Sequence, residues 1–152
     1  MWGYPPELDI EKEATLQRAI IALIQAGLVE SVHDCADGGL AVALVECALP
    51  AGIGLRVKLV GKGLPAEFRL FGEDASRIVL SCDPAYLARI KQVAEDFGVK
   101  ADVLGETSGE RVEITIDGLP AISASVEELR GAYEGALEKA LRAESSSLKE
   151  SE

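Results

Sequence analysis

The stretch Ser31-Val-His-Asp-Cys-Ala-Asp-Gly-Gly-Leu40 decides the fold of this chain, because it leads from a short strand through two aspartates and a Gly-Gly pair into an apolar helix. Gly38 and Gly39 can adopt backbone conformations that are closed to other residues. The first amides of a helix lack partners within the helix, so an anion can dock on them. The stretch also contains His33, the chain's one histidine. It therefore predicts a strand-to-helix turn that is suited to bind a ligand.

The composition bounds the class of protein. The chain has 152 residues, of which 48% are hydrophobic, so it can bury one real core, and one domain is the default. No apolar run approaches the roughly 20 residues of a membrane span, and Met1-Trp-Gly-Tyr-Pro-Pro6 lacks the pattern of a secretory signal. We therefore expect a cytoplasmic protein with no membrane partner. The net charge of −11 repels phosphate backbones, so we expect no nucleic-acid partner either.

The three cysteines, Cys35, Cys47 and Cys82, are an odd number without CxxC spacing, which fits neither a disulfide framework nor a zinc site. We expect reduced thiols, with Cys47 and Cys82 buried in apolar segments. Cys35 lies two residues after His33, a spacing that permits a Cys/His catalytic pair. Such a pair also needs an oxyanion site and an orienting group. We assign no catalytic residue to this chain.

Helices and strands alternate along the chain, as their apolar spacings and end signals indicate. The expected elements up to residue 98 are an amphipathic helix from Asp9 to Gly27, a strand at 29–33, a buried helix at 40–49 ended by Pro50, a strand at 52–60, a strand at 78–82 and a helix from Asp83 to Gly98.

The last third of the chain predicts a hairpin and a helix. Apolar residues alternate over 99–103 and again over 112–116, with the turn Gly105-Glu-Thr-Ser-Gly109 between them. Ser125 and Glu128 form a capping box at the start of a helix. Together the elements predict an α/β (α+β) layered domain with a mixed β-sheet covered by helices. We expect a linker at 1–8, the domain at 9–143 and a disordered tail at 144–152.

A second polar motif, Leu70-Phe-Gly-Glu-Asp-Ala-Ser-Arg77, directly precedes the strand at 78–82. Glu73, together with Ser76 and Arg77, has the polar groups to orient a ligand. The structural alternative is an internal Glu-Arg pair at the entrance of the strand.

Three motifs in order carry a family resemblance: His33 to Leu40, Leu70 to Arg77, and the turn at Gly105-Glu-Thr107. They resemble the C-terminal domain of phosphoribosylformylglycinamidine synthase, of the aminoimidazole ribonucleotide synthetase superfamily, over roughly residues 5–143. The resemblance implies the fold of that C-terminal domain. It also implies part of an ATP-dependent ligase that converts formylglycinamide ribonucleotide, with ammonia derived from glutamine, to formylglycinamidine ribonucleotide.

The same resemblance implies the cofactors and partners of the full enzyme. These are ATP and magnesium, the N-terminal synthetase domains of the same chain, a glutaminase subunit, a small accessory subunit and the small-molecule ribonucleotide. In this superfamily the N-terminal domain carries most nucleotide and magnesium ligands. Because phosphoryl transfer depends on positioning and electrostatic stabilisation, we expect the fragment to be inactive alone. We assign it no cofactor or metal ligand of its own.

The resemblance further implies a set of substrate- or nucleotide-binding residues: His33, Asp34, Asp37, Gly38, Gly39, Glu73 and Ser76. The glycine amides would be available to bind phosphate, and the aspartates to bind metal-bound water or ribose hydroxyls. In the structural alternative, Asp34 or Asp37 caps the following helix, the glycines permit its close approach to the sheet, and His33 bonds a neighbouring strand.

Two positions depart from the usual family pattern, and two other functional classes stay open. Ala36 replaces a serine whose hydroxyl can bond phosphate, and Asp74 adds a negative charge where a serine is common. One alternative is the equivalent domain of a thiamine-phosphate kinase or selenophosphate synthetase, and the other is a free-standing non-catalytic ligand-binding module. The combination of His33-Asp with Leu70-Phe-Gly-Glu favours the purine enzyme.

Overall fold

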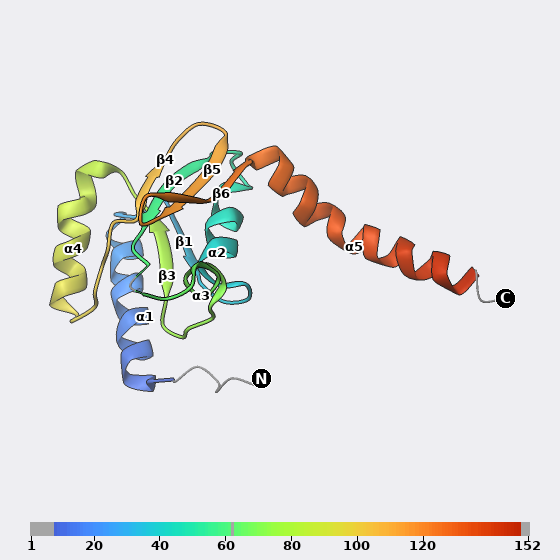
Figure 1. Ribbon diagram of the computed structural model, residues 1–152. Coiled ribbons are helices and arrows are strands. Elements are labelled where there is room, and N and C mark those ends of the chain that lie inside the picture. The colour runs from blue at the N-terminus through green and yellow to red at the C-terminus, as the bar shows by residue number, and fades with distance from the viewer. Residues whose placement is uncertain (1–7, 62, 150–152) are drawn as a thin grey trace.

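The computed structural model describes residues 8–61 and 63–149, without the side chains of 137–140 and 142–149 (Figure 1). The elements are α1 (Ile10–Gln25), β1 (Ser31–Asp34), α2 (Gly39–Ala48), β2 (Leu55–Leu59), α3 (Ala66–Phe71), β3 (Ile78–Ser81), a 3₁₀ turn (Pro84–Tyr86), α4 (Leu87–Asp96), β4 (Gly105–Thr107), β5 (Arg111–Ile116), β6 (Leu119–Ser125) and α5 (Val126–Lys149). None of the helices described there is long and apolar enough to cross a membrane.

The described strands form two sheets. β1 and β3 pair in antiparallel fashion, with His33 opposite Val79. The larger sheet has the order β4-β2-β5-β6, in which β2 and β5 are parallel and the other neighbours antiparallel. This confirms the prediction of an α+β fold with a mixed sheet.

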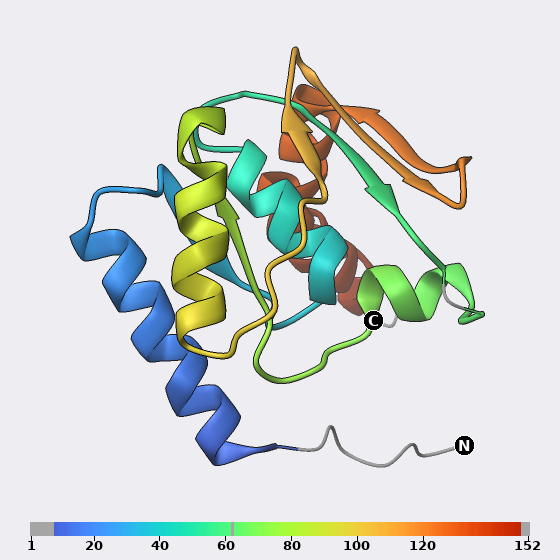
Figure 2. The same cartoon turned by 90° about the vertical axis from the view of Figure 1, so that its left-hand side faces the viewer.

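Helix α2 lies at the centre of the molecule, between the two sheets (Figure 2). Its apolar residues form one core with alternate residues of β2 and β5, of which Val112 and Ile114 are fully buried. In β2, Leu55, Val57 and Leu59 are buried in alternation with exposed residues, as the period of two predicts. A helix that is apolar on nearly every face has to be enclosed in this way.

Helices α1 and α4 pack against each other and against β3 on the other side of the molecule. Leu23, Ile90 and Val93 form the buried centre of this second cluster, with Leu80 packed against it. Both helices begin where local chemistry predicts. Asp9 accepts hydrogen bonds from the amides of the first turn of α1, and Asp83 accepts one at the 3₁₀ turn before α4.

The predicted hairpin between 99–103 and 112–116 is wrong. Residues 99–104 form no strand, and β4 pairs with β2, so that β2 separates it from β5. The actual hairpin joins β5 to β6 through Asp117 and Gly118, which have φ values of 50° and 81°. An Asp-Gly pair is the standard signal for such a two-residue turn. Alternation identifies a strand, but it does not identify the strand's partner.

Two further elements differ from the prediction. Helix α3, six residues long, and strand β6 had no expected counterpart. Helix α5 begins with the predicted capping box, in which the Ser125 amide donates to Glu128 at 2.7 Å and the Glu128 amide donates to the Ser125 hydroxyl at 3.1 Å. It projects from the body (Figure 1) and continues to Lys149, so residues 144–149 are helical where a disordered tail is expected. Residues 1–7 and 150–152, and with them most of the predicted linker, lie outside the described residues.

Candidate functional site

The two polar motifs meet in space. The pairing of β1 with β3 places the turn after β1 beside the loop that enters β3. The Gly38 amide donates a hydrogen bond of 2.9 Å to Glu73 Oε1, and the Cys35 amide donates one of 3.0 Å to the Arg77 carbonyl. We call this junction of residues 33–39 and 72–77 the motif corner.

Gly39 allows α2 to approach the end of α3 closely. Its φ is +67°, and a Cβ atom there would lie 2.8 Å from the carbonyl oxygen of Gly72 and 2.8 Å from the carbonyl carbon of Phe71. Gly38 is also left-handed, with φ of +81°. The glycines therefore permit a close approach, as the structural alternative predicts, but the partner is the end of α3 instead of the sheet.

The amides of both glycines have partners within the chain. Gly38 donates to Glu73, and Gly39 donates to the Ala36 carbonyl at 3.0 Å. A phosphate that used the Gly38 amide would have to displace the Glu73 carboxylate. The proposed helix cap is wrong, because Gly38 occupies the N-cap of α2 without a side-chain cap, and Asp34 and Asp37 are exposed.

His33 is held by its own motif and by α2. Its Nδ1 lies 2.7 Å from the Asp34 carbonyl oxygen, and its Nε2 lies 3.5 Å from Glu46 Oε2. The backbone of His33 pairs with the neighbouring strand β3, but its side chain does not bond that strand as the structural alternative expected. In the sequence Glu46 stands out as the lone charge of an apolar helix, a pattern that favours a residue at a solvent edge over a buried catalytic acid.

Ser76 points towards α1. It has a positive φ of 60°, and its hydroxyl donates a hydrogen bond of 2.6 Å to Glu13 Oε2. Arg77 donates to the Gly72 carbonyl at 3.1 Å and lies 3.7 Å from Asp74 Oδ2. The arginine at the strand entrance is thus paired with Asp74, whereas the structural alternative expected Glu73.

The hydrogen bond from Ser76 predicts how the Glu13 carboxyl group titrates. The hydroxyl of Ser76, followed by the amide of Gln17, holds the pKa of Glu13 below its ordinary value. A lowered pKa in the folded state favours folding above the ordinary carboxyl pKa, and this contribution is lost as the pH falls through the folded value. We expect Ser76→Ala to move the Glu13 pKa upward in a ¹³C NMR titration of the carboxyl groups. Glu128, whose pKa is lowered by Ser125, is the internal control and should not move. An unchanged Glu13 titration would contradict the contact.

The cysteines do not form the Cys/His pair. Cys35 is buried, and burial raises the pKa of its thiol, an effect that the nearby Arg77 partly offsets. The nucleophile in such a pair is the thiolate, and the His33 ring nitrogens lie against Asp34 and Glu46. All three cysteines are free. Cys47 and Cys82 are half-buried, whereas the sequence predicts full burial.

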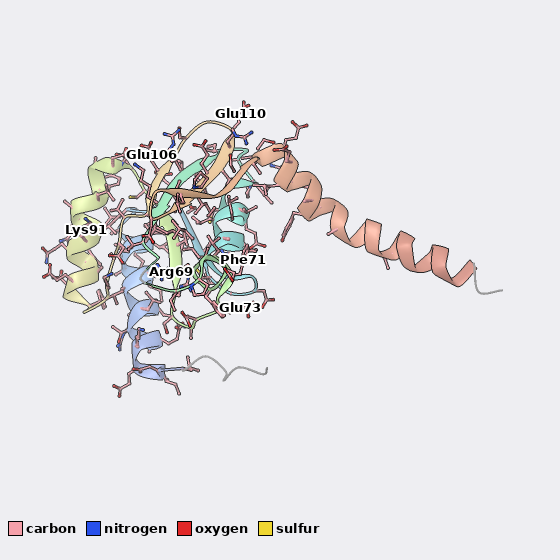
Figure 3. All side chains as sticks on the ribbon, viewed as in Figure 1. Arg69, Phe71, Glu73, Lys91, Glu106 and Glu110 are labelled. Carbon is pink, nitrogen blue, oxygen red and sulfur yellow. The ribbon has the colours of Figure 1, made fainter. Side chains whose placement is uncertain are left out.

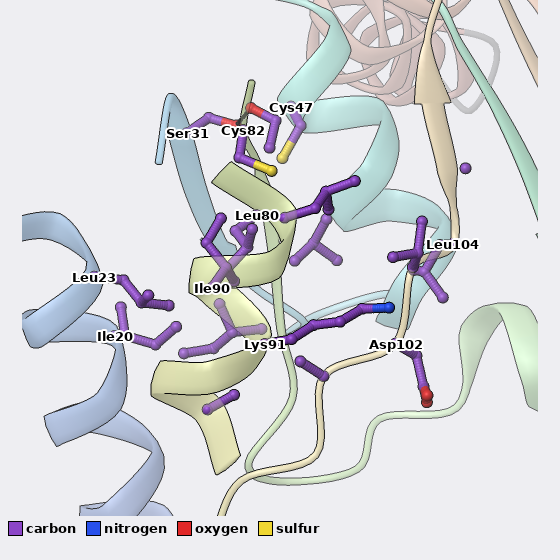
Figure 4. Close-up of a pocket in the computed structure, with 18 of the residues that line it drawn as sticks. Ile20, Leu23, Ser31, Cys47, Leu80, Cys82, Ile90, Lys91, Asp102 and Leu104 are labelled. Atoms are coloured by element: carbon purple, nitrogen blue, oxygen red, sulfur yellow. Dashed lines mark hydrogen bonds between the residues drawn. The ribbon is translucent and has the colours of Figure 1, made fainter. Parts of the chain in front are cut away.

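A cavity of about 440 Å³ lies apart from the motif corner (Figure 4). Its walls come mainly from α1, β3, α4 and the segment 99–107, and most of them are apolar, with Leu23, Leu80 and Ile90 among the lining residues. Lys91 extends across it. None of the predicted site residues lines this cavity. The cavity lies between the core around α2 and the cluster formed by α1, α4 and β3. No sequence pattern predicted a cavity there.

The motif corner is acidic and open to solvent. Asp34, Asp37, Glu73 and Asp74 are all exposed at its rim. Within the residues that the structure describes, no three His, Cys, Asp or Glu side chains are grouped so as to hold a metal ion.

The fold and the motif corner together define a class of protein. It is an α+β domain in which a glycine turn after β1 contacts an acidic loop before β3 at the surface. A family model described as AIR synthase related protein, C-terminal domain, matches residues 3–117. The chain belongs to this family, which confirms the predicted family and fold. Strand β6 and helix α5 lie beyond the matched residues.

Two similar proteins carry the same name. The chain is 42% identical over 127 residues to phosphoribosylformylglycinamidine synthase subunit PurL of Moorella thermoacetica, covering 84% of this chain and 17% of that protein. It is 38% identical over 140 residues to the subunit PurL of Thermus thermophilus, covering 92% and 19%. The chain thus spans about a fifth of the length of these relatives.

Solved structures share the fold. A structure of T. maritima PurL complexed with FGAR aligns with a TM-score of 0.71 and 23% identity, over 77% of this chain and 20% of that one. A structure of PurLQS from Thermotoga maritima aligns with a TM-score of 0.72 and 20% identity, over 80% and 22%. At these identities the likeness shows the fold alone.

Proposed function

We propose that this chain is the C-terminal domain of a phosphoribosylformylglycinamidine synthase and is inactive alone. The whole enzyme would convert formylglycinamide ribonucleotide, ATP and glutamine-derived ammonia to formylglycinamidine ribonucleotide in the cytoplasm. The observation that carries this proposal is the Gly38–Glu73 hydrogen bond, which joins the two family motifs into one corner. The relatives named above support it, because they carry this enzyme's name at 38–42% identity.

The motif corner would act by binding and orienting the ribonucleotide. Asp34 and Asp37 are exposed carboxylates, which can accept hydrogen bonds from ribose hydroxyls. Glu73 is held on the Gly38 amide and would have to give way to a phosphate there. ATP and magnesium belong to the whole enzyme in this proposal, with ligands chiefly on its other domains. The other partners would be the glutaminase subunit and the small accessory subunit.

Exposed aromatic side chains beside the corner support an interface with the rest of the enzyme. Phe68 and Phe71 of α3 are both exposed, and Figure 3 shows Phe71 close to Glu73. Large apolar side chains that gather on a surface often mark an interaction site. The remaining four-fifths of the length of the relatives provides a partner for this face.

A domain exchange tests the proposed function. The matching segment of the Moorella thermoacetica relative is replaced by this chain, and formylglycinamidine ribonucleotide formation is measured with ammonia as nitrogen donor. We expect activity in the chimera and none in the isolated chain. Asp37→Asn should lower kcat/KM by about tenfold or more, because a hydrogen bond to a charged group contributes about 1.5–3 kcal/mol.

Two controls separate the outcomes. Asp96→Asn removes an exposed carboxylate on α4, on the other side of the molecule, and should leave kcat/KM unchanged. A chimera that folds, as circular dichroism shows, but makes no product would refute the proposed function. An active chimera in which Asp37→Asn changes nothing would refute only the role of Asp37.

A further inference from the structure

Three elements are linked by polar side chains behind the His33 ring. The Tyr133 hydroxyl on α5 donates a hydrogen bond of 2.8 Å to Glu46 Oε1 on α2. The other oxygen of that carboxylate, Oε2, lies 3.5 Å from His33 Nε2 at β1. Glu46 and Tyr133 are 87 positions apart in the sequence, so no local sequence pattern predicts their hydrogen bond.

The His33 ring is held at both nitrogens. Nδ1 lies 2.7 Å from the Asp34 carbonyl oxygen, which can only accept a hydrogen bond. Nδ1 therefore carries a proton and donates a hydrogen bond to that oxygen. Nε2 is turned towards the Glu46 carboxylate. The partner of one ring nitrogen decides the orientation and the role of the other.

The two side chains nearest the motif corner, His33 and Glu46, are partly buried. They are 33% and 27% exposed. When Nε2 carries a proton, water and salt therefore screen its attraction to the Glu46 carboxylate less than they screen a fully exposed pair. Glu46 also raises the pKa of Tyr133, which keeps the hydroxyl protonated and able to donate. Tyr133 lies outside the residues that match the family model.

We propose that Glu46 and Tyr133 are positioning residues that hold the His33 imidazole so that the face of its ring, and not a ring nitrogen, meets the ribonucleotide. Helix α5 thereby becomes part of the site, although it projects from the body and contributes no predicted ligand contact. This inference rests on the proposed function, because it assumes that His33 contacts the ligand. Neither residue touches the ligand in this arrangement, and both act through His33.

The first test uses the fact that His33 is the chain's one histidine, so two-dimensional ¹H–¹⁵N spectra of the chain contain one imidazole. We expect Nδ1 of the wild-type imidazole to carry a proton, because it faces the Asp34 carbonyl oxygen. Tyr133→Phe and Glu46→Gln should both shift the Nε2 resonance. Tyr86→Phe is the matched control, because Tyr86 and Tyr133 are 43% and 56% exposed, and it should leave the imidazole unchanged. An Nε2 resonance that is unmoved in both Tyr133→Phe and Glu46→Gln would overturn the proposal.

The second test introduces the same variants into the chimera described above. We expect Tyr133→Phe to lower kcat/KM about tenfold, which is the lower end of the loss seen when the residue that orients a metal-bound histidine is removed. Tyr86→Phe should have no effect. Shifted imidazole signals with unchanged kinetics would overturn the positioning role. An inactive wild-type chimera would refute the proposed function instead, and in that case an unmoved Nε2 resonance in the first test would still overturn the Tyr133–Glu46–His33 link.

Discussion

Gly39→Ala is expected to lower the free energy of unfolding by about 3 kcal/mol. Alanine in the left-handed region costs about 1–2 kcal/mol, and forcing an atom into a packed site costs about 1–3 kcal/mol more. Both costs apply here, because φ is +67° and the new Cβ would lie 2.8 Å from the Gly72 carbonyl oxygen. Urea denaturation followed by circular dichroism measures the change.

Gly27→Ala is the matched control. Gly27 has nearly the same φ, +65°, but a Cβ there would meet nothing within 4 Å. We expect a loss of about 1 kcal/mol, which represents backbone strain alone. The difference between the two variants isolates the close approach of α2 to α3. Equal losses would show that this approach does not constrain the motif corner.

Ile114→Ala is expected to lower the free energy of unfolding by about 4 kcal/mol. The Ile114 side chain is 0% exposed, and it lies in the core formed by α2 and the larger sheet. Truncating a buried isoleucine removes its transfer free energy and leaves a cavity, which together cost about 2–5 kcal/mol. The same urea experiment measures it, and we expect no change in the slope of the transition.

Ile53→Ala makes the same chemical change at a residue that is 48% exposed, just before β2. Surface truncations usually change stability by less than about 0.5 kcal/mol, and a half-exposed side chain should cost about 1 kcal/mol or less. A loss at Ile114 no greater than at Ile53 would contradict the central position of β5 in the core.

Element ends and sheet faces followed from local chemistry. Asp9, Asp83 and the Ser125–Glu128 capping box start helices at the expected residues, because each cap satisfies amides only two or three residues away. The alternation over 55–59 identified both faces of β2 for the same reason. Strand partners were not predictable in this way. β2 pairs with both β4 and β5, a choice that depends on how α2 and the sheet pack together.

Only part of the candidate site could be read from the sequence. The glycine turn and the polar strand entrance were visible as motifs, but their direct contact was not. The Gly38–Glu73 bond spans 35 positions, and it required the pairing of β1 with β3. Ser76 was expected in the site, yet its hydroxyl bonds Glu13 of α1. Glu46 was visible only as the lone charge of an apolar helix, and Tyr133 not at all, because the fold alone brings Tyr133 to Glu46 and Glu46 to His33.

The sequence by itself determined the family, the fold class and the turn at Gly38 and Gly39. Glycine conformations, helix caps and apolar periods depend on neighbours within a few residues, so composition and spacing are enough to reveal them. The tertiary structure decided which donors of the motif are already occupied and what holds its histidine. The Gly38–Glu73, His33–Glu46 and Glu46–Tyr133 contacts join residues 13 to 87 positions apart, and only the packing of α2 between the two sheets brings them together.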